Sequence, residues 1–243
     1  MRKNLAVLSI VVRSSIYKIL LVLFGMSLVQ IGFFYSCLLK KDLTDFNFLS
    51  HLNYAWNLEV LVAHIHMKEV FLVTLVLIGV ILLWAMGEKS GTKQAYYYNR
   101  ISVKRSCRFW LWTGYAVFVF ALLYMVQIGL VFVMGLLYEK CSLEGYLYPQ
   151  MYFFTFYQNE FLHNLFPMTD IVKWITNVLF VLVMSVDLVK ANCYSQKPYG
   201  VVWFFLLYLE ALSSEMGHYG WDIVLILVAV IYLGINYKTD YFN

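Results

Sequence analysis

Six long runs of apolar residues constrain the fold of this chain more than any other feature. They lie at Ile16–Leu39, Val70–Met86, Phe109–Leu137, Ile171–Val189, Tyr199–Leu212 and Trp221–Asn236. Because 62% of the 243 residues are hydrophobic, the chain has more apolar surface than a soluble domain of this length can bury. A helix of about twenty apolar residues crosses the hydrocarbon core, and continuous rather than alternating runs exclude a barrel. We therefore predict an all-α integral membrane protein, a single transmembrane domain over residues 1–243 with six transmembrane helices.

The distribution of charge predicts the orientation of these helices. With the N-terminus inside, thirteen of the eighteen Lys and Arg residues fall on the cytoplasmic side and five on the outer side. The outer five are Lys40, Lys41, Lys68, Lys140 and Lys173. Cytoplasmic segments carry an excess of Lys and Arg. We therefore expect both termini in the cytoplasm of a bacterial cell, with the protein in its cytoplasmic membrane.

Several segments depart from this regular plan. The apolar segment Asn4–Val12 fits either a short helix along the inner interface or an N-terminal extension of the first span. The outer segments Lys40–Met67 and Tyr138–Met168 are rich in aromatic residues, so we expect them at the level of the lipid headgroups. The run Tyr199–Leu212 is too short to span comfortably, and we expect part of this region to re-enter the outer leaflet.

The basic connection at residues 87–108 lies between the second and third runs, on the predicted cytoplasmic side. Its stretch Gly87–Gln94 resembles a phosphate-binding loop only superficially. That motif needs one more residue between its glycines and a Lys directly after the second, where this chain has Thr92. We therefore expect no nucleotide and no other cofactor on this chain. The net positive charge does not indicate nucleic-acid binding either. The basic residues follow the predicted sides of the membrane and do not cluster on one face.

The same connection resembles an arrangement found in permease subunits of type-2 ABC exporters. There the second span ends in an acidic–basic–x–Gly–Thr sequence, which Glu88–Thr92 matches. A short coupling helix and a Pro-Ile/Val-Ser-Arg-like turn follow in that family. Asn99–Ser102 matches this turn in part: Arg100 replaces the proline, no Arg follows Ser102, and Tyr96–Tyr98 replaces the usual leucines. Six spans with both ends inside, an interfacial N-terminal segment and a broken segment before the last span are also similar to that family.

The resemblance implies a function and a set of partners. It implies a transport subunit that is not itself an enzyme, pairs with a second permease copy or a homologous permease, and binds separate P-loop ATPase subunits that hold ATP and Mg. The coupling helix between spans two and three would dock on the ATPase. Its docking residues would be Glu88, Gly91, Thr92, Tyr96, Tyr97, Tyr98, Arg100 and Ser102. The cargo in such exporters is lipidic, peptide or drug-like.

Glu210 is the second candidate site. A carboxylate within a span costs about 2.5–3.5 kcal/mol by insertion scales, so it should face protein, a cavity or water. Glu210 therefore either lines or gates a transport pathway, or lies near the outer end of a short helix where the polar turn solvates it.

The histidines and cysteines leave two further questions open. His64 and His66, with Glu69 nearby, fit either outer metal ligands or interfacial side chains that form hydrogen bonds, and we assign no metal site. Cys37 and Cys141 lie near the same predicted surface, where they either pair or remain free thiols.

Two functions of other classes compete with the exporter subunit. One is an ATP-independent membrane scaffold or immunity protein that acts through helix–helix contacts. The other is an outward-facing intramembrane enzyme or metal carrier that uses the histidine-containing outer segments. A bound ATPase distinguishes the exporter subunit from both.

Overall fold

The computed structural model describes residues 2–44, 58–87, 104–141, 149–193, 199–215 and 218–241, and the described residues form helices without any strand. The prediction of an all-α protein is confirmed. In chain order the helices are α1 (Arg2–Thr44), α2 (Leu58–His64), α3 (Met67–Met86), α5 (Arg105–Cys141), α6 (Pro149–Gln158), α7 (Glu160–Leu165), α8 (Ile171–Cys193), α9 (Tyr199–Ser213) and α10 (Gly220–Tyr241).

Every one of the six apolar runs lies in a helix, and the helices differ in length. In α1, α3, α5 and α8 the apolar part is long enough to cross a membrane. The apolar parts of α9 and α10 are shorter, at Gly200–Ser213 and Gly220–Ile235. At a rise of about 1.5 Å per residue, the 15 residues of α9 reach roughly 22 Å, less than the hydrocarbon core of about 30 Å. Four crossings are therefore supported by length and composition, and six remain a prediction.

The helix boundaries answer one question that the sequence left open. Asn4–Val12 is the first part of α1, which continues without interruption to Thr44, so this segment extends the first long helix. The fifth run is also a single helix, because α9 passes through Glu210 and ends at Ser213. The short helices α2, α6 and α7 lie within the two aromatic connections between the long helices.

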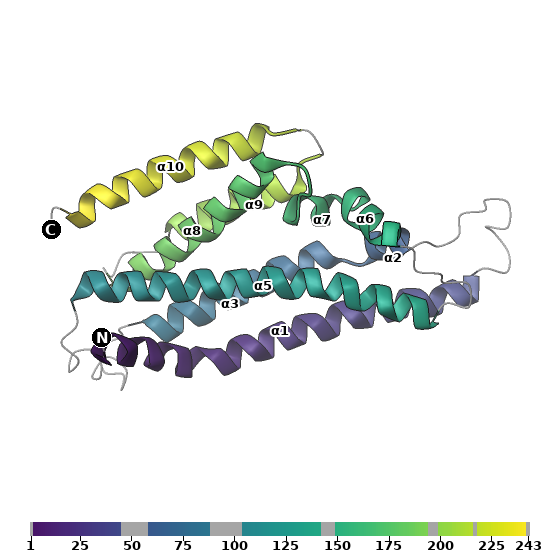
Figure 1. The fold of residues 1–243 in the computed structure, drawn as a ribbon, viewed down its shortest axis with the longest axis horizontal. Helices are drawn as coiled ribbons and strands as arrows, with labels where there is room; N and C mark the ends of the chain where they lie inside the picture. Colours follow the sequence, from purple (N-terminus) through teal and green to yellow (C-terminus); the bar gives the residue numbers. More distant parts are fainter. Residues whose placement is uncertain are drawn as a thin grey trace.

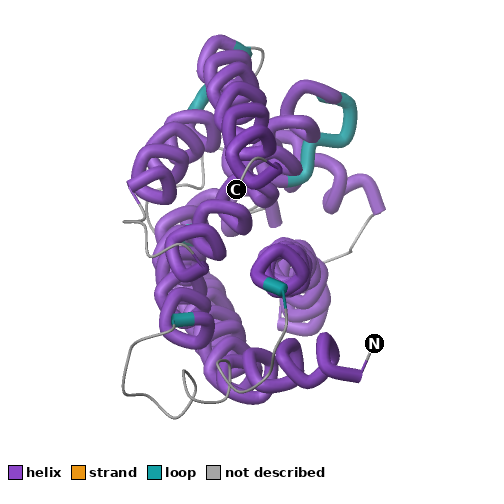
Figure 2. Tube along the Cα trace, turned by 90° about the vertical axis from the view of Figure 1, so that its left-hand side faces the viewer, coloured by secondary structure: helices purple, strands orange, loops and turns teal. Residues whose placement is uncertain are grey.

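The long helices form two groups of three. In Figure 1, α1, α3 and α5 lie along one side of the molecule and α8, α9 and α10 along the other. Each helix packs against both other members of its own group. The groups meet where α8 contacts α3 and α5, and the end view in Figure 2 shows this division. Helix α8 is therefore the main element through which one group packs against the other.

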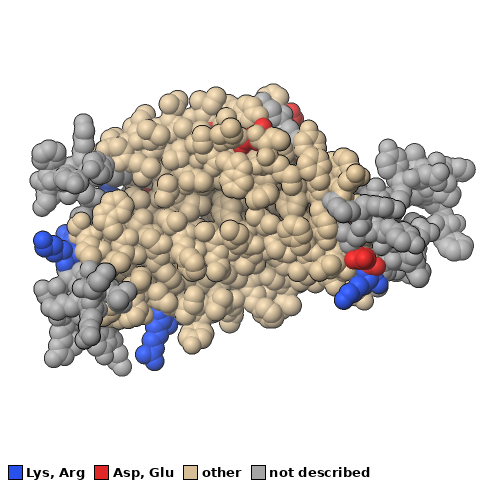
Figure 3. Space-filling view, viewed as in Figure 1, with Lys and Arg blue, Asp and Glu red and all other residues tan. Residues whose placement is uncertain are grey.

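Successive long helices run in opposite directions, so the N- and C-termini lie at the same end of the molecule (Figure 1). Met86 at the end of α3 and Arg105 at the start of α5 also lie at this end. Figure 3 shows Lys and Arg side chains at this end, and acidic side chains beside basic ones toward the other end. An excess of Lys and Arg at the end with the termini is what the positive-inside pattern predicts, and the side of the membrane remains a prediction.

Candidate functional site

The predicted docking residues cannot be placed in the fold. Glu88, Gly91, Thr92, Tyr96, Tyr97, Tyr98, Arg100 and Ser102 lie outside the described residues. Glu210 is described: its side chain is exposed in the last turn of α9. The position of Glu210 fits the reading of a carboxylate near the end of a short helix.

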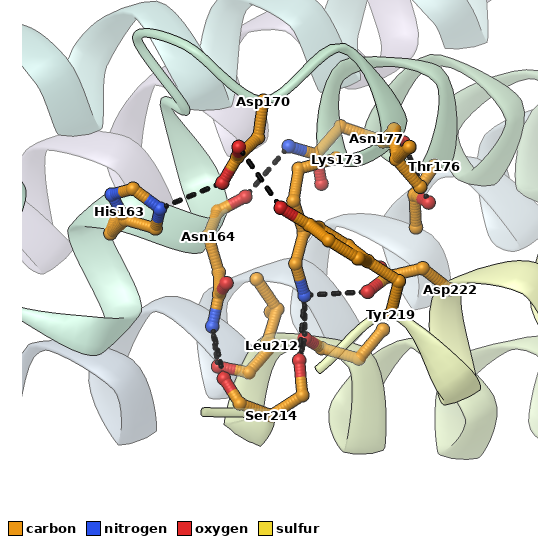
Figure 4. Close-up of polar contacts among 12 residues, drawn as sticks. His163, Asn164, Asp170, Lys173, Thr176, Asn177, Leu212, Ser214, Tyr219 and Asp222 are labelled. Carbon is orange, nitrogen blue, oxygen red and sulfur yellow. Dashed lines mark hydrogen bonds and ion pairs between the residues drawn. The ribbon is translucent and has the colours of Figure 1, made fainter. Parts of the chain in front are cut away.

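A cluster of buried polar side chains lies where α7, α8, α9 and α10 meet, at the end opposite the termini (Figure 4). Its centre is Lys173, near the start of α8, whose side chain is 3% exposed. The Lys173 ammonium donates to the Ala211 carbonyl at 3.1 Å and to Ser214 Oγ at 2.6 Å, and pairs with Asp222 Oδ2 at 2.7 Å. An ammonium has three N–H donors, so this side chain is fully satisfied. One cation thus connects α8 to the end of α9 and the start of α10.

Asp222 makes this cluster sensitive to any change in its partner. Its side chain is fully buried, and neither carboxylate oxygen accepts a hydrogen bond from the described residues, so its polar contact there is the ion pair of Oδ2 with Lys173. Removing one member of a buried ion pair leaves the other charge uncompensated, which costs about 3–5 kcal/mol. The carboxylate of Asp222 is therefore tolerated in the core because Lys173 lies beside it.

Two asparagines attach α7 to the same cluster. Asn164 Nδ2 donates to the carbonyl oxygens of Leu212 and Ser214, both at 3.0 Å. Asn177 Nδ2 on α8 donates to the carbonyl oxygens of Asn164 and Leu165, at 2.9 and 3.1 Å. The carbonyls at a helix end have no partner within their own helix. The amides therefore satisfy carbonyls at the end of α7 and at and just after the end of α9.

The outer part of the cluster is a histidine–aspartate–tyrosine group. Asp170 lies in the turn before α8. Its Oδ2 atom is 3.1 Å from His163 Nε2. Its Oδ1 atom accepts a hydrogen bond of 3.1 Å from the Tyr219 hydroxyl. This hydrogen bond to the carboxylate raises the pKa of Tyr219 above its usual value, because the bond stabilises the protonated hydroxyl. This histidine–aspartate–tyrosine group connects the turn before α10 to the turn before α8.

A chain of hydroxyl groups extends from the cluster toward the other group of helices. Tyr208 on α9 donates to Asn177 Oδ1 at 2.8 Å, and its hydroxyl also bonds to the hydroxyl of Tyr124 on α5. The Tyr208 ring stacks on Phe180 with the ring centroids 3.6 Å apart. Polar contacts thus continue from Asn177, in the first half of α8, through Tyr208 to α5 in the other group of helices.

A second buried carboxylate lies toward the opposite end of α8. Asp187 Oδ1 accepts a hydrogen bond from the Tyr232 hydroxyl on α10. Gly200, near the start of α9, lies so close that a Cβ atom there would be 2.7 Å from Asp187 Oδ2. A larger residue at position 200 would therefore force the Asp187 carboxylate or the start of α9 to move.

The histidines and cysteines form no such centre in the described part of the chain. His66 is exposed and lies 3.7 Å from Glu69 through Nδ1. In the residues that the structure describes, no three His, Cys, Asp or Glu side chains gather as metal ligands would. Cys37 and Cys107 are free thiols, and the side chain of Cys141 lies outside the described part of the chain.

The cluster around Lys173 was missed in the sequence, where Lys173 counts only as a charge on the outer side. A signal was present: Lys173 and Asp222 are each the third residue of their helix, and each lies inside an apolar run. Ionisable residues within spans face protein or water and pair with one another. The charges in the fourth and sixth runs therefore indicated that each side chain needs a partner, without identifying that partner.

No protein-family model, no curated protein and no solved structure matches this chain.

Proposed function

We propose that this chain is the membrane-spanning permease subunit of an ATP-binding-cassette exporter in the cytoplasmic membrane. It moves a lipidic, peptide or drug-like cargo with energy from a separate P-loop ATPase, beside a second permease copy or a homologous permease. The observation that carries this proposal is the position of the connection between α3 and α5. The two helix ends that flank it lie at the same end of the molecule as both termini, and its sequence resembles a coupling loop.

The packing of α3 and α5 supports a coupling role for this connection. Both helices contact α1 and each other, and both contact α8. A force applied where α3 ends and α5 begins therefore acts on both groups of helices. Packed helices transmit such displacements because well-packed interiors are hard to compress. The docking residues of the proposal are Glu88, Gly91, Thr92, Tyr96, Tyr97, Tyr98, Arg100 and Ser102.

The ATPase partner is the direct test. Cells expressing the tagged chain are crosslinked before solubilisation, and mass spectrometry identifies the proteins that purify with it. We expect a stoichiometric P-loop ATPase, lost in a Tyr97→Ala/Tyr98→Ala variant because buried Tyr side chains are typical anchors at interfaces. The matched control is Tyr17→Ala/Tyr35→Ala, which removes two exposed tyrosines from α1 and should retain the ATPase.

Recovery of intact chain without any ATPase would contradict the proposal. The ATP-independent scaffold or immunity protein would then be the better account. An ATPase that stays bound to the Tyr97→Ala/Tyr98→Ala and Gly91→Pro variants, with unchanged transport, would instead contradict only the assignment of the loop.

A further inference from the structure

A cavity of about 370 Å³ lies where two breaks between helices face the end of α9. One break, at Ile65–His66, separates α2 from α3, and the other, at Asn159, separates α6 from α7. Small-molecule sites typically enclose roughly 300–1,000 Å³ and combine apolar walls with a few polar groups. Here the apolar wall includes Phe161 and Leu212, and the polar lining includes His66, Lys68, Glu69, Gln158, Glu160 and Ser213.

Lys68, the lysine that lines this cavity, is positioned by a hydrogen bond to the end of α9. The side chain of Lys68 is half-buried, and its ammonium donates a hydrogen bond to Ser213 Oγ at the end of α9. An ammonium has three donors, and Ser213 is its one hydrogen-bond partner among the described residues. Two N–H groups of a positioned cation are therefore available to an anion.

The carboxylates of the cavity lie farther out. Glu69 and Glu160 are both exposed, whereas the neighbouring wall residue Leu212 is buried. From wall to rim, the lining thus changes from apolar side chains to a half-buried cation and then to exposed anions. A ligand that fits this order has an apolar part, then an anion, then a cation nearest to water.

We propose that this cavity binds a phosphoethanolamine group, with the phosphate on Lys68 and the primary ammonium on Glu69 and Glu160. Lysine binds phosphate as a compact point charge, and hydrogen bonds between ionised groups are the strong ones. A primary ammonium has three donors for the two carboxylates, whereas the quaternary ammonium of choline has none. The site is independent of the proposed exporter function.

The surface beside the cavity suits a phospholipid as the source of this group. Helix α6 exposes the apolar rings of Phe153, Phe154 and Tyr157 next to the α6–α7 break that lines the cavity. The acyl chains pack on these rings and on the apolar wall of the cavity, so that the phosphate reaches Lys68 and the ammonium lies at the rim. The same headgroup chemistry also occurs in free phosphoethanolamine, so the experiment includes both ligands.

The test is equilibrium binding to the purified full chain in a neutral detergent. Radiolabelled O-phosphoethanolamine is measured by dialysis, and dihexanoyl phosphatidylethanolamine by native mass spectrometry. Lys68→Gln should raise the Kd by about tenfold and Glu160→Gln by about fivefold, because each removes one charge-assisted contact. Lys68→Arg keeps the cation and should restore binding to within about threefold of the native chain.

Exposed Lys140 and Glu139 lie at the same end of the molecule outside the cavity lining, so Lys140→Gln and Glu139→Gln are the matched controls.

Binding of both ligands, or of the lipid alone, would support the site and identify its source. Binding of the soluble ligand alone would support the site without a lipid. The proposal is overturned if neither ligand binds, if phosphocholine and glycerophosphate bind equally well, or if Lys68→Gln and Glu160→Gln bind like the two controls. Melting temperatures of all variants show whether a loss of binding reflects a loss of fold. The ATPase is not needed for any of these measurements, so their failure is distinct from a failure of the exporter proposal.

Discussion

The two groups of three helices are held together by different kinds of polar contact. In the group α1, α3 and α5 the buried polar pairs are neutral: Gln30 and Gln127 exchange two hydrogen bonds of 2.9 and 3.0 Å, and Ser15 bonds to Tyr115 at 2.8 Å. The group α8, α9 and α10 buries charged side chains in addition to neutral ones: Lys173 pairs with Asp222, and Asp187 accepts a hydrogen bond from Tyr232.

This difference follows the position of the contacts along the helices. Gln30 and Gln127 lie in the interior of long helices, where an uncharged amide pair can satisfy its own donors and acceptors. Lys173 and Asp222 lie in the first turn of their helices, where carbonyls and hydroxyls at the end of α9 complete the coordination of the ammonium. The Lys173 charge is thus placed where additional partners exist. The group that contains α8 should accordingly respond far more strongly to the loss of one polar partner.

The largest effect is expected at Lys173. Lys173→Met keeps most of the volume of the side chain but leaves Asp222 buried without a counter-charge, which should lower the free energy of unfolding by about 3–5 kcal/mol. Unfolding in mixed micelles with increasing SDS measures this value. In the double variant Lys173→Met/Asp222→Leu the loss should be less than half as large. A single variant as stable as the native chain would mean that the ion pair does not hold this group together.

The next effect is expected at the other end of α8. Gly200→Ala places a Cβ atom against the Asp187 carboxylate and should cost about 1–3 kcal/mol by overpacking. Gly25→Ala on α1 is the matched control, because no heavy atom lies within 4 Å of its added Cβ. The control should be neutral or stabilising by up to about 1 kcal/mol, since Ala favours a helix over Gly. Equal effects at the two glycines, in the same unfolding assay, would contradict the close approach of α9 to α8.

A smaller effect is expected in the neutral group. Gln127→Leu leaves the Gln30 amide buried without its partner and should cost about 1–2 kcal/mol. Replacing both glutamines by leucine removes both polar groups and should return the stability to near the native value. If Gln127→Leu costs as much as Lys173→Met, the proposed contrast between the two groups is wrong.

The smallest effect is expected at the exposed side of the charged cluster. Asp170→Asn removes the carboxylate that accepts from Tyr219, so the pKa of Tyr219 should fall back toward its usual value of about 10. Titration of ¹³C-labelled tyrosine by NMR measures the change, with Tyr219→Phe assigning the signal. A pKa that is unchanged in Asp170→Asn would show that this hydrogen bond is not formed in solution.

The sequence predicted the helices well because each apolar run carries its own signal. The runs at 16–39, 109–137 and 171–189 all lie inside single long helices. Helix ends were predicted less well: α1 begins at Arg2 and continues to Thr44, since cations such as Arg13 and Lys18 do not stop a helix at a membrane interface.

The polar cluster could not be predicted, because it depends on which helix ends lie side by side. Lys173 and Asp222 are 49 positions apart, and Asn164 reaches carbonyls that follow it by 48 and 50 residues. Charge and periodicity show that such side chains need partners, but only the packing of α7, α8, α9 and α10 identifies them. Lys68 is a similar case, since its partner Ser213 is 145 positions away.

The measurement that tests the exporter account most directly is the side of the membrane on which the connections lie. Single cysteines are introduced at Gln94, between α3 and α5, and at His218, between α9 and α10, in a chain whose four native cysteines are replaced by serine. A membrane-impermeant maleimide is then applied to intact cells and to inverted vesicles. The account predicts that position 94 is labelled only in inverted vesicles and position 218 only in intact cells. Labelling of position 94 in intact cells would contradict it, because no cytoplasmic ATPase could then reach the loop.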